Sequence, residues 1–373
     1  MSQTIDAAAY LVKNAAGIPS PALLVYEETL RENIDRAVAM AGGAARLRPH
    51  VKTHKTPRIV EAMMRAGITK FKCATIAEAE MLALCGAGDV LIAYQPVGPQ
   101  VERLAALAVK YPGTAFSTIV DDEGALRALA AALARAGQAA EVLLDLDVGM
   151  HRTGIPAGDG AFRLYGLLCG LEGVRPGGLH GYDGHNHQTD PAERRAAADA
   201  CLAEVRALQD RLEKAGMPVP RLVMGGTPTF PCYASHPGVE LSPGTCFLHD
   251  GSYGRFPDLA FRPAALLLSR VVSVPGPDAF TLDLGHKAIA ADPQGPRGIV
   301  LGHETARAVM QSEEHWTLEE RHDGRVAVGD LMYVLPTHVC PTFALHQEVH
   351  VIGPDGYRRE CWPVTARDRR ISV

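Results

Sequence analysis

The 373-residue sequence lacks the apolar run of about 18 residues that a membrane-spanning helix needs. It also lacks any Cys-x-x-Cys pair. Its eight cysteines are scattered, which is typical of reduced thiols and not of a disulfide framework or a zinc finger. A basic surplus is missing too, because the net charge is −5, whereas a nucleic-acid-binding protein normally carries a basic patch. We therefore expect no membrane partner and no nucleic-acid partner.

The first residues, MSQTIDAAAYLVKNAAG, carry an acid and no basic segment before a short apolar stretch. We therefore expect no signal peptide and a cytoplasmic protein. No low-complexity tract or solenoid repeat is present. The composition, 47% hydrophobic, is sufficient for a sizeable core, and two domains are expected because single cores stop growing near ~250–300 residues.

From about residue 28 to 244, helix-patterned segments alternate with short apolar runs that resemble buried parallel strands. The predicted helices are Glu28–Gly42, Pro57–Gly67, Ile76–Gly86, Glu123–Gly137 and Pro191–Gly216. The predicted strands are Leu47–Lys52, Phe71–Thr75, Val90–Tyr94, Ala115–Val120, Val142–Asp147, Gly177–Tyr182, Leu222–Gly225 and Val239–Ser242. Eight strands alternating with helices indicate a (β/α)8 TIM barrel, with a doubly wound open sheet as the alternative.

After about residue 255 the helical periodicity disappears, and runs typical of an antiparallel β domain follow. These runs are Leu268–Val274, Phe280–Leu284, Gly298–Leu301, Trp316–Glu320, Leu331–Leu335 and Glu348–Ile352. The early run Pro21–Tyr26 can belong to either domain.

Lys52 is unusual because the chain has eight lysines against 29 arginines, yet this one ends an apolar strand run. The period of two in a strand places Arg48, His50 and Lys52 on one face. A partly buried lysine crowded by cations loses its proton more readily, as Schiff-base chemistry requires. The alternative is a strand-end lysine that extends its ammonium to water.

Two further motifs follow predicted strands. Gly225-Gly226-Thr227 and Gly244-Thr245 offer backbone N–H groups where barrels commonly hold a phosphate, although Gly-Gly pairs are also typical of tight turns. His338-Val339-Cys340 places two side chains on the same side of an extended chain, and imidazole with thiolate favours zinc.

A bare His-x-Cys is a weak motif. His315 with Glu313 and Glu314 forms either further ligands or a solvated turn, and we expect His346 and His350 on an exposed strand face.

Five segments together resemble the D-threonine aldolase and D-serine dehydratase family. They are Arg48–Lys55 (RPHVKTHK), Thr75–Glu80, Asp147–Gly154, Gly225–Thr229 and Pro336–His346. The likeness extends from about residue 20 to 365. It implies a fold-type III pyridoxal phosphate enzyme related to alanine racemase, which works as a head-to-tail homodimer.

The resemblance implies a TIM barrel over residues 28–255, and a mostly antiparallel β domain formed by 1–27 with 256–373. Lys52 matches the Schiff-base lysine, and His338 and Cys340 match a divalent-metal pair that would hold zinc, manganese or magnesium, with zinc favoured by the thiolate. The cofactor-binding residues it implies besides Lys52 are Arg152, Tyr182, Gly226, Thr227, Gly244 and Thr245. Cys340 is typical of the dehydratases, whereas the segment Pro341–His346 resembles the aldolases.

The activity implied is retro-aldol cleavage of D-threonine-type substrates to glycine and an aldehyde. Metal-bound hydroxide, His185 or His187 would be the base. The alternative is β-elimination from D-serine or 3-hydroxyaspartate to a keto acid and ammonia, in which Lys52 takes the Cα proton. Two other classes are a non-catalytic pyridoxal phosphate-binding protein and a barrel metallohydrolase without that cofactor.

Overall fold

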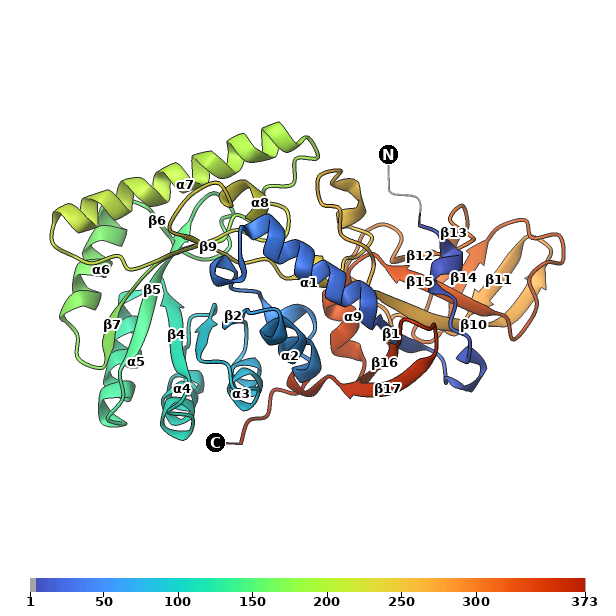
Figure 1. Ribbon diagram of the computed structural model, residues 1–373, viewed down its shortest axis with the longest axis horizontal. Coiled ribbons are helices and arrows are strands. Elements are labelled where there is room, and N and C mark those ends of the chain that lie inside the picture. Colours follow the sequence, from blue (N-terminus) through green and yellow to red (C-terminus); the bar gives the residue numbers. More distant parts are fainter. Residues whose placement is uncertain (1–4, 373) are drawn as a thin grey trace. The chain divides into compact units, whose positions relative to one another are not determined.

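The structure is a computed structural model that describes residues 5–372 (Figure 1). Its contacts divide the chain into two compact units. The barrel unit comprises Ala37–Lys52, Ile59–Gly244 and the tail from Asp368. The β unit comprises the chain up to Arg36, Thr53–Arg58 and Thr245–Arg367.

The barrel unit is built on a parallel sheet whose strands follow one another in sequence order. Its strands are β2 (Lys70–Cys73), β3 (Asp89–Ile92), β4 (Ala115–Val120), β5 (Ala140–Asp147), β7 (Val174–Gly181), β8 (Leu222–Met224) and β9 (Val239–Leu241), with the short β6 (Ile155–Pro156) beside β5. Seven of the eight predicted strands are confirmed to within a few residues. Their parallel pairing in sequence order excludes the doubly wound alternative, because that fold needs a reversal of strand order.

The eighth predicted strand, Leu47–Lys52, is only partly extended. Leu47 bridges Leu241 of β9 and His50 bridges Lys72 of β2, so this segment fills the gap between the first and last strands and closes the barrel. Lys52 lies beyond it in a 3₁₀ turn, Val51–Thr53. The prediction that Arg48, His50 and Lys52 share one strand face is therefore wrong for Lys52, because the strand period ends before the turn.

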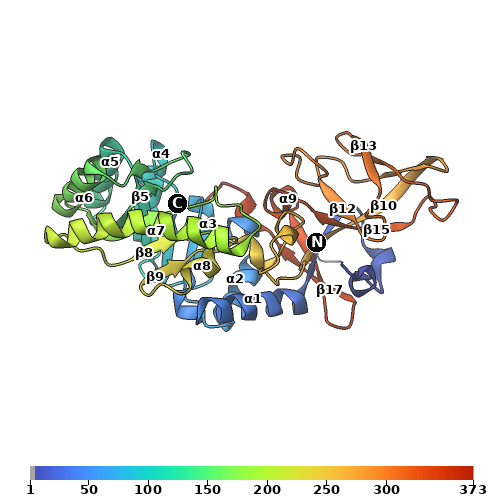
Figure 2. The ribbon, with the colours of Figure 1, turned by 90° about the horizontal axis from the view of Figure 1, so that it is seen from above.

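Helices flank these strands (Figures 1 and 2). They are α2 (Pro57–Arg65), α3 (Ile76–Leu84), α4 (Pro99–Lys110), α5 (Glu123–Arg135), α6 (Asp159–Gly170), α7 (Pro191–Lys214) and the short α8 (Phe230–Tyr233); α1 (Glu27–Ala41) is divided between the two units. The five predicted helices are confirmed, whereas α4 and α6 were not predicted. Both complete the alternation of strand and helix that the barrel requires.

A charged cluster closes the barrel interior beside the segment Leu47–His50. Arg48 is fully buried, and its Nε lies 2.6 Å from Glu240 Oε2 while Nη1 lies 2.8 Å from Asp89 Oδ1. Burial alone would raise the pKa values of Asp89 and Glu240, but the Arg48 guanidinium lowers both below their usual values. Lys70 Nζ adds a contact of 2.5 Å to Glu240 Oε1. Arg48 is thus an ion-paired structural residue and not an uncompensated cation beside Lys52.

The β unit contains a nine-stranded, mostly antiparallel sheet. Its strands are β1 (Ala22–Tyr26), β10 (Ala265–Gly276), β11 (Ala279–Leu282), β12 (Gly298–Val300), β13 (Arg307–Gln311), β14 (Trp316–Glu319), β15 (Leu331–Pro336), β16 (Glu348–Ile352) and β17 (Arg358–Pro363). β1 pairs antiparallel with β10 and parallel with β16, so the early run Pro21–Tyr26 joins the β unit, as the resemblance implies.

Three features of the β unit differ from the sequence analysis. β13 and β17 were not predicted, and neither was the helix α9 (Val339–Leu345), because it is too short to show a helical period. His346 ends α9 and its Nε2 lies 2.8 Å from the Ala288 carbonyl, so its expected place on an exposed strand is wrong. The chain passes from the barrel unit to the β unit at Gly244–Thr245, before the expected residue 255, and residues 28–36 and 53–58 belong to the β unit instead of the barrel.

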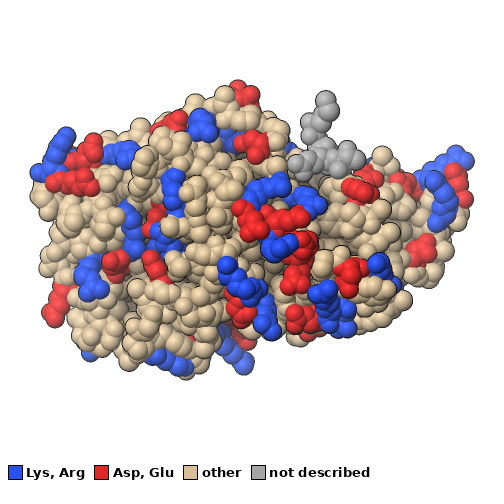
Figure 3. All heavy atoms as spheres, viewed as in Figure 1, with Lys and Arg blue, Asp and Glu red and all other residues tan. Residues whose placement is uncertain are grey.

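Two simpler expectations concern the cysteines and the membrane. All eight cysteines are free thiols. Within residues 5–372, no helix is both long and apolar enough to span a bilayer. On the face shown in Figure 3, Lys and Arg side chains are interspersed with Asp and Glu and form no single-sign patch.

A substitution of Gly178 in β7 tests how closely the backbone of this strand packs against the neighbouring chain segment. Its φ is +111°, and an added Cβ would lie 2.0 Å from the Arg221 carbonyl oxygen. We expect Gly178→Ala to lower the free energy of unfolding by about 3 kcal/mol or more, because backbone atoms cannot move aside cheaply. Urea denaturation of the purified protein measures the loss.

The matched control is Gly137→Ala, where φ is +64° and no atom lies within 4 Å of an added Cβ. This change should cost only about 1–2 kcal/mol, from the left-handed backbone alone. Equal losses in the two variants would contradict the close strand packing.

Candidate cofactor pocket and metal-ligand pair

Lys52, the predicted cofactor lysine, emerges from the closing segment of the barrel. It is half-buried, and its backbone N–H lies 3.4 Å from the Nδ1 atom of His50. Its side chain lines a cavity of about 530 Å³ in the barrel unit. The 3₁₀ turn therefore presents the amine of Lys52 to a space of the size that small-molecule sites usually have, about 300–1,000 Å³.

Residues from six of the eight strand positions and the turns after them line this cavity. The lining comprises His50, Lys52, Lys72, Ala74, Ala93, Tyr94, Gln95, Val97, Ile119, Asp121, Asp145, Arg152, Thr153, His180 and Tyr182. Most of them lie at or just beyond the carboxyl ends of strands, the position at which barrels carry their reactive groups. The predicted residues Lys52, Arg152 and Tyr182 therefore share one cavity.

Tyr182, directly after β7, has three cations over or beside its ring. The Nζ atoms of Lys52 and Lys72 each lie 5.8 Å from the ring centroid, and the Arg152 guanidinium carbon lies 4.9 Å from it. Rings attract cations through their electron-rich faces. Three positively charged side chains thus lie around the Tyr182 ring in the wall of the cavity, and their charge suits an anionic ligand.

Asp145 and His180 form a buried pair in the cavity wall that the sequence analysis did not single out as a site. His180 Nδ1 lies 2.6 Å from Asp145 Oδ1, and both side chains are almost inaccessible to solvent. Burial lowers the pKa of His180, although Asp145 acts in the opposite direction. A neutral imidazole that donates from Nδ1 to the carboxylate keeps Nε2 as its acceptor. The sequence signal that could have revealed His180 was its spacing of two residues from Tyr182 at the end of a predicted strand, because such residues point to the same face.

The turn that carries Arg152 is held by Asp147. Its Oδ1 accepts hydrogen bonds from the backbone N–H groups of Gly149 (3.0 Å) and His151 (2.9 Å). Partial burial would raise the pKa of Asp147, but these bonds and the His151 ring lower it. Gly154 ends the turn with φ +97°, where a Cβ would meet the Asp147 backbone nitrogen at 2.5 Å. The motif DVGMHRTG is therefore a rigid support for Arg152.

The predicted phosphate loop Gly225–Thr229 is anchored from behind by Asp183. Asp183 is buried and accepts hydrogen bonds from Thr229 Oγ1 (2.8 Å) and Tyr233 OH (2.7 Å). The Gly226 N–H in turn donates to Thr229 Oγ1 at 3.2 Å. Asp183 thereby fixes the shape of this loop.

Gly244 lies beside the same loop, because its N–H is 3.3 Å from Thr227 Oγ1. A Cβ on Gly226 would approach the Tyr182 ring to 3.1 Å, so the loop needs glycine to lie this close to the ring. Gly226, Thr227 and Gly244 thus come together as predicted for a phosphate site. Thr245 begins the β unit, and its hydroxyl lies 3.5 Å from Cys340 Sγ.

These residues fit pyridoxal phosphate. The cavity is lined by amines and a guanidinium that suit an anionic aldehyde, and the glycine-rich loop after β8 suits a phosphate. Lys52 would hold the aldehyde carbon.

The two histidines predicted as candidate bases lie on the turn after β7. His185 and His187 are both exposed, and the Nε2 atom of His185 lies 3.0 Å from where a Cβ on Gly149 would stand. The histidines that line the cavity are His50 and His180.

The predicted metal pair lies at the start of α9 in the β unit. His338 precedes the helix and Cys340 is in its first turn, so the two side chains do not project from an extended chain, as the spacing suggested. They nevertheless interact. Their hydrogen bond, opposed by burial and assisted by Asp292, raises the pKa of His338 to about 9. An imidazole and a thiol in contact, with one carboxylate beside the ring, fit a divalent metal such as zinc.

Asp292 and Asp250 support this pair and had no sequence signal. Asp292 Oδ2 lies 2.6 Å from His338 Nδ1, which fixes the orientation of the ring. Asp250 is buried and accepts from the Val339 N–H at 2.9 Å, and burial raises the pKa of Asp250 to about 7. Thr53 Oγ1 lies 3.3 Å from Cys340 Sγ.

A second cluster of metal-ligand types occurs on β16 and β17. Glu348, His350 and Cys361 have ligand atoms within 4.8 Å of one another. Arg358 Nη2 lies 3.4 Å from Cys361 Sγ, so a guanidinium already stands beside the sulfur. A like-charged cation would be repelled there.

Comparison with known proteins shows which family the chain is similar to. The family model "Alanine racemase, N-terminal domain" matches residues 25–249, and "Putative serine dehydratase domain" matches residues 264–352. A D-threonine aldolase of Arthrobacter sp. is 30% identical over 86% of this chain and 85% of its own. The crystal structure of D-threonine aldolase from Filomicrobium marinum has a TM-score of 0.89 at 29% identity, over 96% of this chain and 98% of that one.

A third relative is the D-threo-3-hydroxyaspartate dehydratase of Delftia sp. HT23, whose structure has a TM-score of 0.80 at 26% identity, over 93% of this chain and 98% of that one. A further similar structure, with a TM-score of 0.79 at 26% identity, is a D-threo-3-hydroxyaspartate dehydratase with a cysteine-to-alanine mutation in the metal-free form.

The barrel, the β unit and the cofactor pocket define an alanine racemase-like fold. The chain belongs to the D-threonine aldolase and D-serine dehydratase family, and it is a pyridoxal phosphate-dependent lyase.

Asp292→Asn tests the support of the metal pair. An Asn side chain keeps the shape but removes the charge that orients His338, and loss of such a partner typically weakens metal binding by about 10–100-fold. Competition with a zinc chelator measures the affinity. Asp278→Asn, an exposed carboxylate of the same unit, is the control. Unchanged zinc affinity in Asp292→Asn would contradict the orienting role.

Proposed function

We propose that the protein cleaves D-β-hydroxy amino acids of the D-threonine type to glycine and an aldehyde, with pyridoxal phosphate and a divalent metal. The likeness to two D-threonine aldolases, each covering more than four-fifths of both chains, carries this proposal. The substrate would be a small D-amino acid.

In the barrel unit, Lys52 would hold the cofactor covalently, and Arg152 and Tyr182 would contact its ring. Gly226, Thr227 and Gly244, with Thr245 next along the chain, would hold its phosphate. Bound pyridoxal phosphate supplies an electron sink for the carbanion that cleavage of the Cα–Cβ bond creates. The task of these residues is to bind and orient the cofactor and to exclude water.

In the β unit, His338 and Cys340 would hold the metal, which would supply Lewis-acid chemistry toward the β-hydroxyl of the substrate. Asp292 keeps the His338 ring in one orientation. His185 and His187 stay the proposed bases for the hydroxyl proton, and general-base catalysis by such a residue typically contributes about 10²–10⁴-fold.

A second candidate is dehydration of D-serine or 3-hydroxyaspartate to a keto acid and ammonia. Cys340 favours it, because a thiol beside His338 is the ligand type expected of the dehydratases. The Delftia dehydratase is a relative of comparable coverage, and a metal-free structure of a D-threo-3-hydroxyaspartate dehydratase carries a cysteine-to-alanine mutation. In this reaction the freed amine of Lys52 would take the Cα proton.

Product analysis separates the two functions. With D-threonine we expect glycine and acetaldehyde in equal amounts, and no ammonia above the background. D-Serine and D-threo-3-hydroxyaspartate are the parallel substrates, assayed for keto acid and ammonia. Keto acid as the sole product from every substrate would contradict the aldolase proposal and support the dehydratase.

Lys52→Ala tests the cofactor site. Reduction of the wild-type protein with borohydride should attach the cofactor mass to the peptide that contains Lys52. The Lys52→Ala protein should be colourless and lose activity by at least about 10³-fold, because the covalent attachment is gone. Lys287→Ala, an exposed lysine of the β unit, is the control. An adduct on Lys55 or Lys287, or a coloured and active Lys52→Ala protein, would refute the assignment.

A further inference from the structure

Lys72 is a second lysine of the cofactor pocket, and it has no role in the proposed reaction. It is the third residue of β2, and its backbone pairs with the closing segment through the bridge to His50 and the N–H bond to Pro49 (2.8 Å). Its side chain lines the cavity and only 3% of the residue is exposed. Lysines are almost never this buried unless they are paired.

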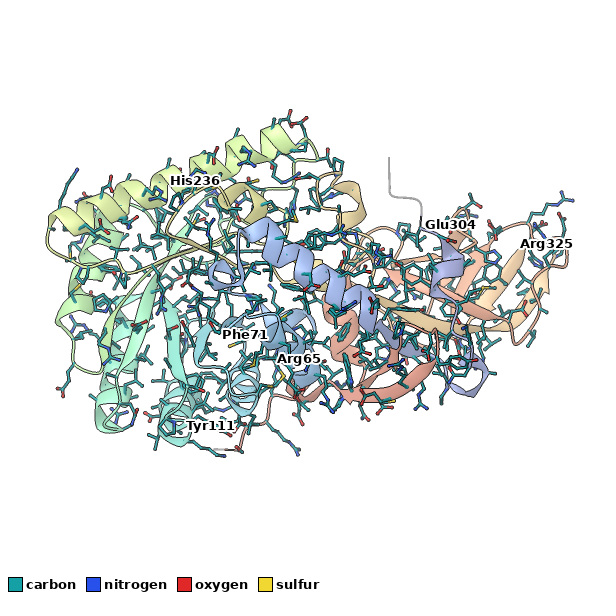
Figure 4. All side chains as sticks on the ribbon, viewed as in Figure 1. Arg65, Phe71, Tyr111, His236, Glu304 and Arg325 are labelled. Carbon is teal, nitrogen blue, oxygen red and sulfur yellow. The ribbon has the colours of Figure 1, made fainter. Side chains whose placement is uncertain are left out.

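The strand alternation explains where Lys72 points. Phe71, labelled in Figure 4, is completely buried on the opposite face of β2. Lys70 and Lys72 therefore share the face toward the barrel interior. Lys70 is ion-paired with Glu240 at 2.5 Å. Lys72 lies one step closer to the carboxyl end of the strand, in the cavity.

Among residues 5–372, Lys72 Nζ has neither a hydrogen bond nor an ion pair, and it lies 5.8 Å from the centroid of the Tyr182 ring. The carboxylates that act on it electrostatically are Asp145 and Asp183. Asp145 is bonded to His180, and Asp183 to Thr229 and Tyr233. An unpartnered amine in a buried position costs free energy unless a ligand compensates it.

The surroundings of Lys72 also disfavour the protonated form of its amine. Burial, followed by the positive charge of Lys52, lowers the pKa of Lys72 to about 7, and Arg48 adds to this effect while the two carboxylates oppose it. Arg152, His180 and Tyr182 are the other polar groups of the same wall. Lys72 therefore gains or loses its proton near neutral pH, and the charge of the neighbouring Lys52 opposes its protonation.

We infer that Lys72 is a positioning residue of the cofactor site, whose charge acts on the nitrogen of Lys52 and thereby sets the proton content of the covalent cofactor linkage. This inference rests on the proposed attachment of the cofactor to Lys52. Two like-charged nitrogens beside one aromatic ring repel each other, so the pocket holds fewer protons than two isolated amines would hold. When Lys72 is protonated, its charge favours the neutral form of the cofactor linkage. When Lys72 loses its proton, the charged form of the linkage becomes more favourable.

The test is a spectrophotometric pH titration of the cofactor-loaded protein, because the charged and neutral linkages absorb at different wavelengths. Three proteins are compared: wild type, Lys72→Met and Lys72→Arg. Methionine keeps the volume without charge, whereas arginine keeps a permanent charge. The midpoint should be highest in Lys72→Met and lowest in Lys72→Arg, with a difference of about 1–2 pH units, the size expected of one unit charge several ångströms away.

Lys70→Met is the matched control, because it removes one lysine from the same face of the same strand. Its midpoint should stay within about 0.3 pH unit of wild type, since that lysine is ion-paired with Glu240 and does not line the cavity. A melting curve accompanies each variant. A purely structural Lys72 would change the melting temperature of Lys72→Met and leave the midpoint unmoved, which would overturn the inference.

If Lys72→Arg does not fold, the comparison of wild type with Lys72→Met still decides, because the midpoint must rise in the variant. Coincident or reversed midpoints refute the role of Lys72 alone, provided that borohydride labels Lys52 in wild type. A wild-type adduct on Lys72, or no adduct, refutes the proposed function together with the inference.

Discussion

The buried guanidinium of Arg48, paired with Asp89 and Glu240, is the interaction on which the barrel unit depends. A completely buried cation is tolerated only because two carboxylates from β3 and β9 reach it. These pairs hold the segment Leu47–His50 between the first and last strands, where only two isolated bridges replace a full strand ladder. The turn that carries Lys52 follows directly from this segment, so the same ion pairs position the cofactor lysine.

The pocket above this charged layer is organised around one aromatic ring. Tyr182 contacts the amines of Lys52 and Lys72 and the guanidinium of Arg152, and three different strands or turns supply these cations. Two carboxylates support the surroundings of the ring: Asp147 holds the turn of Arg152, and Asp183 holds the glycine loop that lies against the ring. An aldehyde phosphate is the kind of ligand that neutralises such a set, and this explains why positive groups can be concentrated there.

The β unit shows the same division between reactive and supporting side chains. His338 and Cys340 are recognisable as ligand types, but the carboxylates that make them a site, Asp292 and Asp250, lie far away in the sequence. The short helix α9 brings the histidine and the cysteine together in a way that an extended chain does not. Seven residues cannot display a helical period, so pattern alone predicted a strand end in its place.

Local patterns predicted the eight-fold alternation, the later β domain and the candidates Lys52, His338 and Cys340, because periodicity and unusual residue types are visible along the chain. The candidates Arg152 and Tyr182 came from the family resemblance. The tertiary structure alone decided that Arg48 is ion-paired, that Lys72 is buried near Lys52 without an ion pair among residues 5–372, and that His180 enters the cavity. Such outcomes depend on which side chains meet across the barrel interior. Pairing between Arg48 and Glu240, which are 192 positions apart, leaves no trace in local sequence.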